Sequence, residues 1–533
     1  LILLMTLADI GDFDILEPKP QQQTGRKHEH AEFIKKETQN SAKRSTVWRA
    51  SRLQYVATQS NRKLEISWEF YMCYVLNEKI GLRSWWRVPY AYYVKGRRDA
   101  QRLTKEEFEL LSLCDGQTEI ADSSLVERLV QRRMISACEV GAACLDPWQK
   151  MDCDNRYFPA MNLMITGKCN YNCLHCFNAS DNSPLMAEFT LEEAEKLLDE
   201  AQRCGINAFT ITGGEPMCHK DFLPIIEGIY KRGMFVEELN TNGFYINQAV
   251  LDRMKEIGCN PLIKISFDGI GHHDWLRNRK GAEEDALRAI KLCVDNGFRV
   301  KAQTNVHRRN IESMLPTARL LDEMGVYEMR IIRTTEVPRW NENAKGATLD
   351  LDEYFDKMLD FVREYISEDH KMVIDIWQLM TLFPRSKSYN LRTVACCDGE
   401  YKPTRPVCPG NRSMVAVSAN GNVFPCMQMS GYYEARNDIL GNVKEYGLQP
   451  LLQMGKYLAE VCATVGELAE VNEECRNCPY FKYCAAGCRA VALTLTGDKM
   501  GVDLSKCLFF KKGYYEKVVR TMGVWRNNTP INV

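Results

Sequence analysis

The chain has 533 residues and a mass of 61.3 kDa, which is enough for about three to four domains of ordinary size. Its 69 Lys and Arg residues are balanced by 70 Asp and Glu residues, so the overall charge does not favour nucleic acid or an acidic membrane surface as a partner. No apolar run approaches the roughly 18 residues of a membrane-spanning helix, and we expect no secretory signal because no basic region precedes the short apolar start.

Residues 1–71 are predicted to be a disordered extension. The stretch is mostly polar, and beyond its first few residues no apolar periodicity is visible. A solvated tail is the simplest interpretation. A basic arm that contacts a partner is the alternative.

Residues 72–145 are predicted to form a small module in which strands precede helices. The first part is rich in aromatic and branched residues, as hairpins are. Thr104 and Glu107 then form a capping box before an amphipathic helix, and Ser124 with Glu127 repeats the pattern before a second helix. The module is too short for an independent enzyme, so we interpret it as a binding module.

Residues 155–370 alternate between strand-like runs and helices with a 3.6-residue period, which predicts a parallel sheet. Six such units make either an open doubly wound sheet or an incomplete barrel, with the functional site at the carboxyl ends of the strands. The predicted strands are 162–166, 208–212, 235–241, 262–268, 299–306 and 328–334, and the predicted helices are 190–205, 222–233, 247–258, 283–297, 311–325 and 351–366.

Residues 395–520 lose this alternation, and residues 521–533 are interpreted as a tail. Gly, Pro, Asn and Cys are frequent between 395 and 520. A cysteine-rich region without regular periodicity needs another source of order, and metal can supply it. The chain has 22 cysteines, and in the reducing cytoplasm that we expect, clustered cysteines more often serve metal or redox chemistry than disulfides.

Three cysteines follow the first predicted strand of the alternating region. Cys169, Cys173 and Cys176 lie in a CX3CX2C loop at the functional end of the sheet. Three thiolates can hold three irons of a cubane cluster and leave the fourth iron without a protein ligand. A zinc site completed by His175, or buried free thiols, are the alternatives.

This loop resembles that of the radical S-adenosylmethionine (radical SAM) enzymes. The resemblance implies a partial (β/α)6 TIM-like barrel and a [4Fe–4S] cluster whose open iron chelates the amino and carboxylate groups of S-adenosylmethionine. In that family, one electron from the cluster cleaves the sulfonium, and a 5′-deoxyadenosyl radical abstracts hydrogen from the substrate. His175 occupies the place of the family's usual aromatic residue near the adenine.

The same resemblance assigns further cofactor contacts. The GGEP motif after the second strand matches the family's site for the amino group, Ser266 resembles its ribose or carboxylate contact, and Arg277 is a candidate for the carboxylate. Ordinary turn or capping roles stay open for Asn305 and other residues at the strand ends. No general base can be assigned. The implied cofactor-binding residues are Gly213, Gly214, Glu215, Pro216, Ser266, His175, Asn305 and Arg277.

A second group of cysteines lies near the carboxyl end. Its unequal spacers and seven thiols do not suit one tetrahedral zinc site. The order is similar to the SPASM extension of radical SAM enzymes, which implies two auxiliary [4Fe–4S] clusters. One cluster would be held by Cys475, Cys478, Cys484 and Cys507, and the other by Cys408, Cys426 and Cys488, with Cys397 or Cys396 as a possible fourth ligand. An open iron on that second cluster could bind substrate, whereas a closed cluster suits electron relay.

Next to these motifs, residues 72–145 resemble the winged-helix-like α+β peptide-recognition domain of peptide-modifying systems, which is related to the peptide chaperone of pyrroloquinoline quinone biosynthesis. That domain adds a leader peptide to a sheet edge. A plain winged-helix interaction domain is the alternative.

Together the resemblances predict an α/β enzyme with a C-terminal cysteine-rich iron–sulfur domain. It would modify a ribosomally made precursor peptide, forming a thioether cross-link as sactipeptide or ranthipeptide maturases do. Peptide epimerisation, carbon–carbon cross-linking and anaerobic sulfatase maturation use similar scaffolds. A non-enzymatic iron–sulfur electron carrier and a binding protein with structural zinc are the non-enzyme alternatives. We expect flavodoxin or ferredoxin as reductant, a cytoplasm poor in oxygen, and no nucleic-acid or membrane partner.

Overall fold

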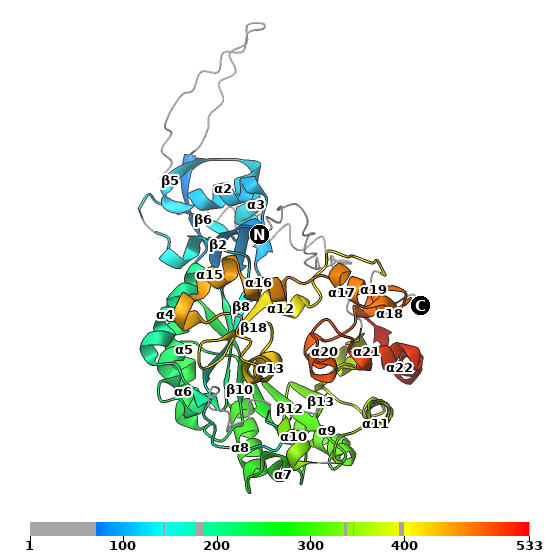
Figure 1. Ribbon diagram of the computed structural model, residues 1–533. Helices are drawn as coiled ribbons and strands as arrows, with labels where there is room; N and C mark the ends of the chain where they lie inside the picture. The colour runs from blue at the N-terminus through cyan, green and yellow to red at the C-terminus, as the bar shows by residue number, and fades with distance from the viewer. Residues whose placement is uncertain are drawn as a thin grey trace, which may run out of the picture. The chain divides into compact units, whose positions relative to one another are not determined.

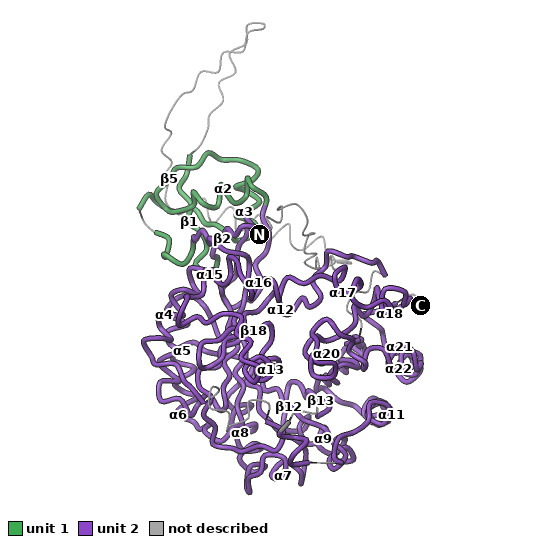
Figure 2. Tube along the Cα trace, in the orientation of Figure 1, with its two compact units in different colours: residues 1–80, 104–149 green, residues 81–103, 150–533 purple. Residues whose placement is uncertain are grey.

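The computed structural model describes residues 71–141, 144–176, 186–334, 338–344, 346–393 and 399–531. The chain divides into two compact units, shown in two colours in Figure 2. Of the described residues, 71–80 and 104–149 belong to the first, and those in 81–103 and 150–531 to the second. The stretch 72–145, expected to be one module, is thus shared between the two units.

The first unit contains a three-stranded antiparallel sheet in the order β5-β1-β6, with two helices. Its elements are β1 (Tyr71–Leu76), α2 (Lys105–Leu113), β5 (Asp115–Ala121), α3 (Ser124–Gln131) and β6 (Ile135–Cys138). The capping box of Thr104 and Glu107 is present at α2. The expectation for Ser124 is wrong: α3 is capped by Ser123, whose side chain accepts from the Val126 N–H, because Ser124 already lies inside the helix.

The second unit is dominated by a twelve-stranded sheet in which the six predicted strands are consecutive, parallel neighbours. This confirms the expected partial barrel. The strands are β8 (Ala160–Thr166), β9 (Ala208–Gly213), β10 (Phe235–Thr241), β11 (Leu262–Ser266), β12 (Val300–Val306) and β13 (Glu328–Arg333).

Helices cover the outer face of these strands (Figure 1). They are α4 (Leu191–Arg203), α5 (Phe222–Lys231), α6 (Gln248–Ile257), α8 (Ala282–Asp295), α9 (Met314–Glu323) and α11 (Leu351–Tyr365), each within or close to its predicted range. Two short helices, α7 (His273–Arg277) and α10 (Pro338–Asn343), were not anticipated. Alternate strand residues such as Ile263, Ile265 and Ile331 pack into the apolar core with the helices, so the residues between them face the inside of the barrel.

Further strands extend the sheet at both edges. Beyond β13 follow β14 (Val373–Ile376), β15 (Met380–Phe383), β16 (Ser388–Leu391) and β19 (Arg526–Asn527), while β17 (Met414–Val417) pairs in parallel with β8 and β18 (Val423–Phe424) completes the other edge. The predicted tail therefore contributes a strand. A separate four-stranded sheet contains β2 (Ile80–Trp85), β3 (Val88–Val94), β4 (Gln101–Arg102) and β7 (Lys150–Asp152).

The cysteine-rich region consists mainly of short helices, which the sequence analysis did not anticipate. They are α12 (Pro409–Ser413), α13 (Ser430–Ala435), α14 (Val443–Tyr446), α15 (Leu448–Gln453), α16 (Lys456–Val461), α17 (Val465–Val471), α18 (Glu473–Arg476), α19 (Phe481–Cys484), α20 (Arg489–Thr496), α21 (Leu504–Lys511) and α22 (Tyr514–Met522). In the part of the chain that the structure describes, no helix is long and apolar enough to span a membrane.

Candidate active site

The three-cysteine loop begins three residues after β8. The Tyr171 N–H donates to the Cys169 sulfur at 3.4 Å, and the Cys176 N–H donates to the Cys173 carbonyl at 3.3 Å. Burial is the main cause that raises the pKa of Cys169 to about 12, and the neighbouring Cys173 and Cys176 thiols contribute to the same rise. The loop therefore brings the three thiols close enough to interact.

The GGEP motif packs against this loop, and its glycines are required by that packing. A Cβ on Gly213 would lie 2.6 Å from the Thr166 carbonyl oxygen, and one on Gly214 would lie 2.5 Å from the Gly167 oxygen. The Gly214 N–H donates to the Thr166 carbonyl at 2.9 Å, and the Glu215 N–H to the Lys168 carbonyl at 2.8 Å. The glycines thus let the backbone of GGEP approach that of the cysteine loop.

Glu215 is fully buried, and protein donors occupy both of its carboxylate oxygens. The Thr241 hydroxyl donates at 2.9 and 3.0 Å and the Asn242 N–H at 2.7 Å. Burial raises the pKa of Glu215 to about 7, although these hydrogen bonds act in the opposite direction. Its side chain ties the loop to the end of β10, while Pro216 opens a short 3-10 helix.

A buried ion-pair group follows β11, whose last residue is the half-buried Ser266. Arg277 from α7 holds the Asp268 carboxylate with Nε at 2.7 Å and Nη2 at 3.1 Å, and His273 lies 2.9 Å from the same carboxylate. Burial would raise the pKa of Asp268, but Arg277 and His273 hold it well below its usual range. The remaining Arg277 nitrogen, Nη1, lies 3.8 Å from the Cys173 sulfur.

His175 meets the end of β12. Its Nε2 lies 3.0 Å from the Asn305 amide nitrogen, and the Asn305 backbone N–H donates to Asp268 at 2.9 Å. With the amide oriented in this way, the Asn305 nitrogen donates to His175 Nε2. The His175 Nδ1 is buried without a hydrogen-bond partner. Burial and the nearby Arg277 charge lower the pKa of His175 to about 3, so the ring is neutral at pH 7.

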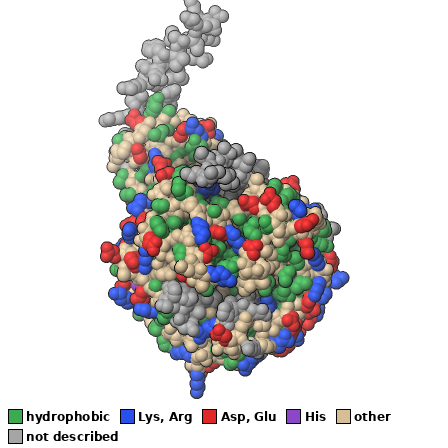
Figure 3. Space-filling view, in the orientation of Figure 1, with side chains coloured by type: hydrophobic (Ala, Val, Ile, Leu, Met, Phe, Trp, Pro, Cys, Tyr) green, Lys and Arg blue, Asp and Glu red, His purple; other side chains and the backbone are tan. Residues whose placement is uncertain are grey.

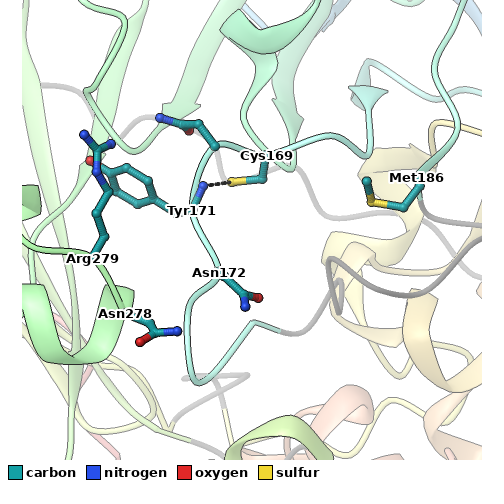
Figure 4. A pocket seen from close by; sticks show the side chains of 7 residues that line it. Cys169, Tyr171, Asn172, Met186, Asn278 and Arg279 are labelled. Atoms are coloured by element: carbon teal, nitrogen blue, oxygen red, sulfur yellow. Dashed lines mark hydrogen bonds between the residues drawn. The ribbon is translucent and has the colours of Figure 1, made fainter.

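A cavity of 460 Å³ opens beside the loop (Figure 4). This volume lies in the range of small-molecule sites. Arg279 stacks over Tyr171, with its guanidinium carbon 4.8 Å from the ring centre, and over Phe244 at 4.2 Å. The cavity is lined by Cys169, Asn170, Tyr171, Asn172, Met186, Asn278 and Arg279.

The C-terminal thiols lie in two groups. Cys475, Cys478 and Cys507 each contribute to raising the pKa of Cys484, to about 12, after the larger effect of burial. Burial and then the Cys488 and Cys408 thiols raise the pKa of Cys426 to about 12. These are the two sets that the sequence assigns to two auxiliary clusters, and the clusters at these positions stay a prediction. Cys396 and Cys397 lie outside the described residues.

The CAAGC segment that joins the two groups has an unusual backbone. Ala485, Ala486 and Gly487 have φ values of 45°, 54° and 81°, and left-handed conformations are unfavourable for alanine. The Ala486 N–H hydrogen-bonds the Cys484 sulfur, and the Cys488 N–H donates to the buried Asp503 at 2.9 Å. The Ala485 and Gly487 N–H groups donate to the Phe481 and Cys484 carbonyls, both at 2.9 Å, so hydrogen bonds within the protein hold this turn between the two thiol groups.

In the described ranges, no three Cys, His, Asp or Glu side chains converge as ligands of one metal ion would. Ligands of a four-iron cluster bind different irons and stand farther apart than ligands of one zinc ion.

Two family profiles match the chain. The Radical SAM superfamily matches residues 163–321, and the SPASM iron–sulfur cluster-binding domain matches residues 408–479. The chain therefore contains a radical SAM domain and a SPASM domain. The cofactors of these domains are [4Fe–4S] clusters and S-adenosylmethionine.

Proteins similar to this chain include a heme synthase, a bacteriocin biosynthesis protein and a protein bound to a precursor peptide. The AdoMet-dependent heme synthase of Methanosarcina barkeri is 28% identical over 339 residues, covering 63% of this chain and 92% of the relative. The subtilosin biosynthesis protein AlbA of Bacillus subtilis is 22% identical over 328 residues, covering 61% and 65%. The crystal structure of Streptococcus suis SuiB bound to precursor peptide SuiA has a TM-score of 0.56 and 14% identity, covering 81% and 99%.

Sequence reasoning missed the cavity wall of the radical SAM domain. Tyr171 and Arg279 lie 108 positions apart in the numbering and meet only in the fold. Cys218, which the sequence analysis did not place in the site, is half-buried and interacts with Tyr245. The aromatic residue inside the CX3CX2C loop was the one available signal. The residues present fit the expected cofactors, because grouped thiols, an unpartnered His175 Nδ1 and a cavity of suitable volume lie around one loop.

Proposed function

We propose that this radical SAM enzyme is a peptide maturase that forms a thioether bond in a ribosomally made peptide. Cys169, Cys173 and Cys176 would hold the cluster that binds S-adenosylmethionine, which when bound supplies a carbon radical able to abstract hydrogen. The GGEP backbone, Ser266 and the neutral His175 would position the nucleotide beside the loop. In the net reaction a C–H and an S–H bond break and a C–S bond forms, so the peptide loses two hydrogens.

The two C-terminal thiol groups have a role in the electron balance of this reaction. After hydrogen abstraction, coupling of a thiolate to the carbon radical leaves one surplus electron, and a one-electron acceptor must take it. The group around Cys484 and the group around Cys426 would hold clusters suited to this step. The thiol proton goes to solvent, because no base can be assigned among the described residues.

The observation that carries the peptide assignment is the first unit. Its sheet has the order β5-β1-β6, so β5 and β6 each have one side that pairs with no other described strand of that sheet. Such an edge can bind an extended peptide by strand addition. A free small-molecule substrate would give no reason for such a unit.

The test is co-expression, without oxygen, with a short cysteine-containing peptide encoded beside the gene. We expect a loss of about two mass units per link together with one consumed thiol. The matched controls are Cys173→Ala, which should abolish the change, and Cys293→Ala, a buried core cysteine on α8, which should not. An unchanged mass with deuterium uptake from solvent would replace thioether formation by epimerisation. An unchanged mass without deuterium uptake would contradict peptide modification.

Tetrapyrrole chemistry is the second candidate, because the heme synthase of Methanosarcina barkeri is 28% identical and matched over 92% of its length. It requires a site for a broad, largely apolar macrocycle. Anaerobic incubation with Fe-coproporphyrin III, S-adenosylmethionine and dithionite would test it. Production of 5′-deoxyadenosine that depends on the tetrapyrrole would favour this candidate over the peptide.

A further inference from the structure

A row of polar side chains crosses the inside of the barrel. Backbone register pairs Ser266 of β11 with Gln303 of β12, Gln303 with Arg330 of β13, and Arg330 with Asp375 of β14. Adjacent strands lie about 4.8 Å apart, so the backbone of Arg330 is about 10 Å from that of Ser266. The row therefore starts at the expected nucleotide contact and ends at a charged cluster.

Arg330 faces inward. Its neighbours along β13, Met329 and Ile331, are fully buried in the core shared with the outer helices, so the residue between them lies on the opposite face of the sheet. Ordinary TIM barrels fill this inner space with branched apolar side chains. Here the inner face carries charged residues, and packing alone does not explain their presence inside a barrel.

Neighbouring groups fix the Arg330 guanidinium. Its Nε lies 3.2 Å from the Asp375 carboxylate, and its central carbon lies 4.2 Å from the centre of the Trp377 ring. Asp375 is already held by Arg392, with Nε at 2.8 Å and Nη2 at 2.7 Å, and by the Thr381 hydroxyl at 3.0 Å. One carboxylate is thus shared by two guanidinium groups.

The outer end of Arg330 is available. Among the residues that the structure describes, no acceptor takes a hydrogen bond from its Nη1 or Nη2, and the side chain retains 18% of its exposure. The two Nη groups form the planar fork that suits a carboxylate. Trp377 packs against the guanidinium, and Asp375 pairs with it through charge alone, because the buried Nε makes no hydrogen bond.

The charges around Arg330 do not balance. Lys264 pairs with Glu238 at 2.7 Å and Lys301 pairs with Glu328 at 2.7 Å, and each pair is neutral. Arg330 and Arg392 share the single carboxylate of Asp375. Among the residues that the structure describes, one positive charge therefore remains, and an anionic group of the substrate would neutralise it.

We propose that Arg330 binds a carboxylate group of the substrate inside the barrel. The proposal rests on the proposed function in one respect: for a peptide substrate, the carboxylate is an acidic side chain near the modified residue. The same chemistry could come from the carboxylates of a tetrapyrrole. Asp375, Arg392 and Trp377 act as positioning residues for Arg330.

Arg330→Gln is the informative variant. It removes the fork but leaves Asp375 bound to Arg392 and Thr381, so no buried carboxylate loses all its partners. Arg299→Gln is the matched control, because Arg299 lies just before β12, is exposed, and contacts the Tyr327 ring at 5.4 Å. Both variants should load the same amount of iron as the wild type.

The first experiment needs no known substrate. The holoenzyme is treated with 2,3-butanedione in the presence of glutarate or of the uncharged glutaramide, and modification of Arg330 is measured by mass spectrometry of its proteolytic fragment. We expect glutarate, and not glutaramide, to slow modification of Arg330 several-fold while Arg299 reacts equally in both. Equal modification in both solutions, or an Arg330 that the small reagent never reaches, would overturn the inference.

The second experiment identifies the source of the carboxylate. Versions of the precursor peptide with single Asp→Asn or Glu→Gln changes, and Fe-coproporphyrin III, are titrated into wild type and Arg330→Gln. One acid-to-amide change should weaken wild-type binding about ten- to hundredfold, as expected for a charge-assisted hydrogen bond, and should have no effect in the variant.

The two proposals then fail separately. If only tetrapyrrole binding depends on Arg330, the carboxylate site stands and the peptide function is contradicted. If the precursor peptide is modified but neither peptide nor tetrapyrrole binding depends on Arg330, the peptide function stands and the carboxylate site is contradicted.

Discussion

Arg277→Met should destabilise the end of the barrel more than any exposed ion-pair change. Asp268 is fully buried, and Arg277 supplies two of its hydrogen bonds, at 2.7 and 3.1 Å. Removing one partner of a buried ion pair costs about 3–5 kcal/mol. Because His273 at 2.9 Å and the Asn305 N–H at 2.9 Å remain, we expect the lower end, about 3 kcal/mol, which corresponds to about a hundredfold in an equilibrium constant.

The assay is hydrogen exchange followed by mass spectrometry, because a chain of several domains has no single free energy of unfolding. The reporting amides are in β11, β12 and the residues just after them, where the Phe267 N–H donates to the Gln303 carbonyl at 3.0 Å. Their exchange should become about a hundredfold faster in Arg277→Met. The control is Arg253→Met, since Arg253 forms ion pairs with a 42% exposed side chain, and its change should be below about tenfold.

A double variant gives the decisive comparison. In Arg277→Met with Asp268→Asn the carboxylate no longer needs a counter-charge, so exchange should slow down again relative to Arg277→Met. If the double variant exchanges as fast as the single one, lost packing rather than an unpaired carboxylate explains the effect, and the electrostatic reasoning is refuted. A second readout is the loaded cluster: loss of the cation 3.8 Å from the Cys173 sulfur should make its reduction potential more negative.

Three further predictions concern separate parts of the molecule. Gly214→Ala places a Cβ 2.5 Å from a backbone oxygen of the cysteine loop, so the iron content should fall by about four atoms per chain, whereas Gly258→Ala, with open space around it, should keep its iron. Burial raises the pKa of Glu215 from 4.5 to about 7. Protonated Glu215 therefore stabilises the folded state by at most about 3 kcal/mol below pH 4.5, and this contribution is lost as the pH rises through 7. Glu215→Gln should remove this pH dependence from thermal melting curves. Ser123→Ala should lower the free energy of opening of α3, measured by hydrogen exchange, by about 1 kcal/mol. Ser124→Ala should change this free energy little, since Ser123 and not Ser124 caps the helix.

The barrel strands and helices could be predicted because their patterns are local. Helix α4 follows the capping box of Thr190 and Glu193 that the sequence shows, and it ends just before Gly205. Helix α7 was missed because its five residues are too few to display a 3.6-residue period. The cap of α3 was placed one residue late because two serines are adjacent and either one fits the pattern.

The roles of the site residues were less predictable, because they depend on contacts between distant strands. The sequence assigned Arg277 and Glu215 to the cofactor as separate contacts, whereas in the structure their charged groups are engaged by Asp268 and by Thr241. Arg330 gave no signal, since a polar residue between apolar neighbours is ordinary strand alternation. Only the register across four strands places it in line with Ser266.

The inner face of the barrel bears on the choice between substrates in a way that sequence identity does not. A tetrapyrrole presents a broad apolar ring, and placing it against ion pairs such as Lys264–Glu238 and Lys301–Glu328 would bury charges that already have partners without adding apolar contacts. An extended peptide brings its own amide groups, which can hydrogen-bond to polar neighbours such as Asn240, whose side-chain oxygen is buried without a partner. The same inner surface that leaves a guanidinium fork open at Arg330 therefore favours a polar polypeptide carrying an acidic residue.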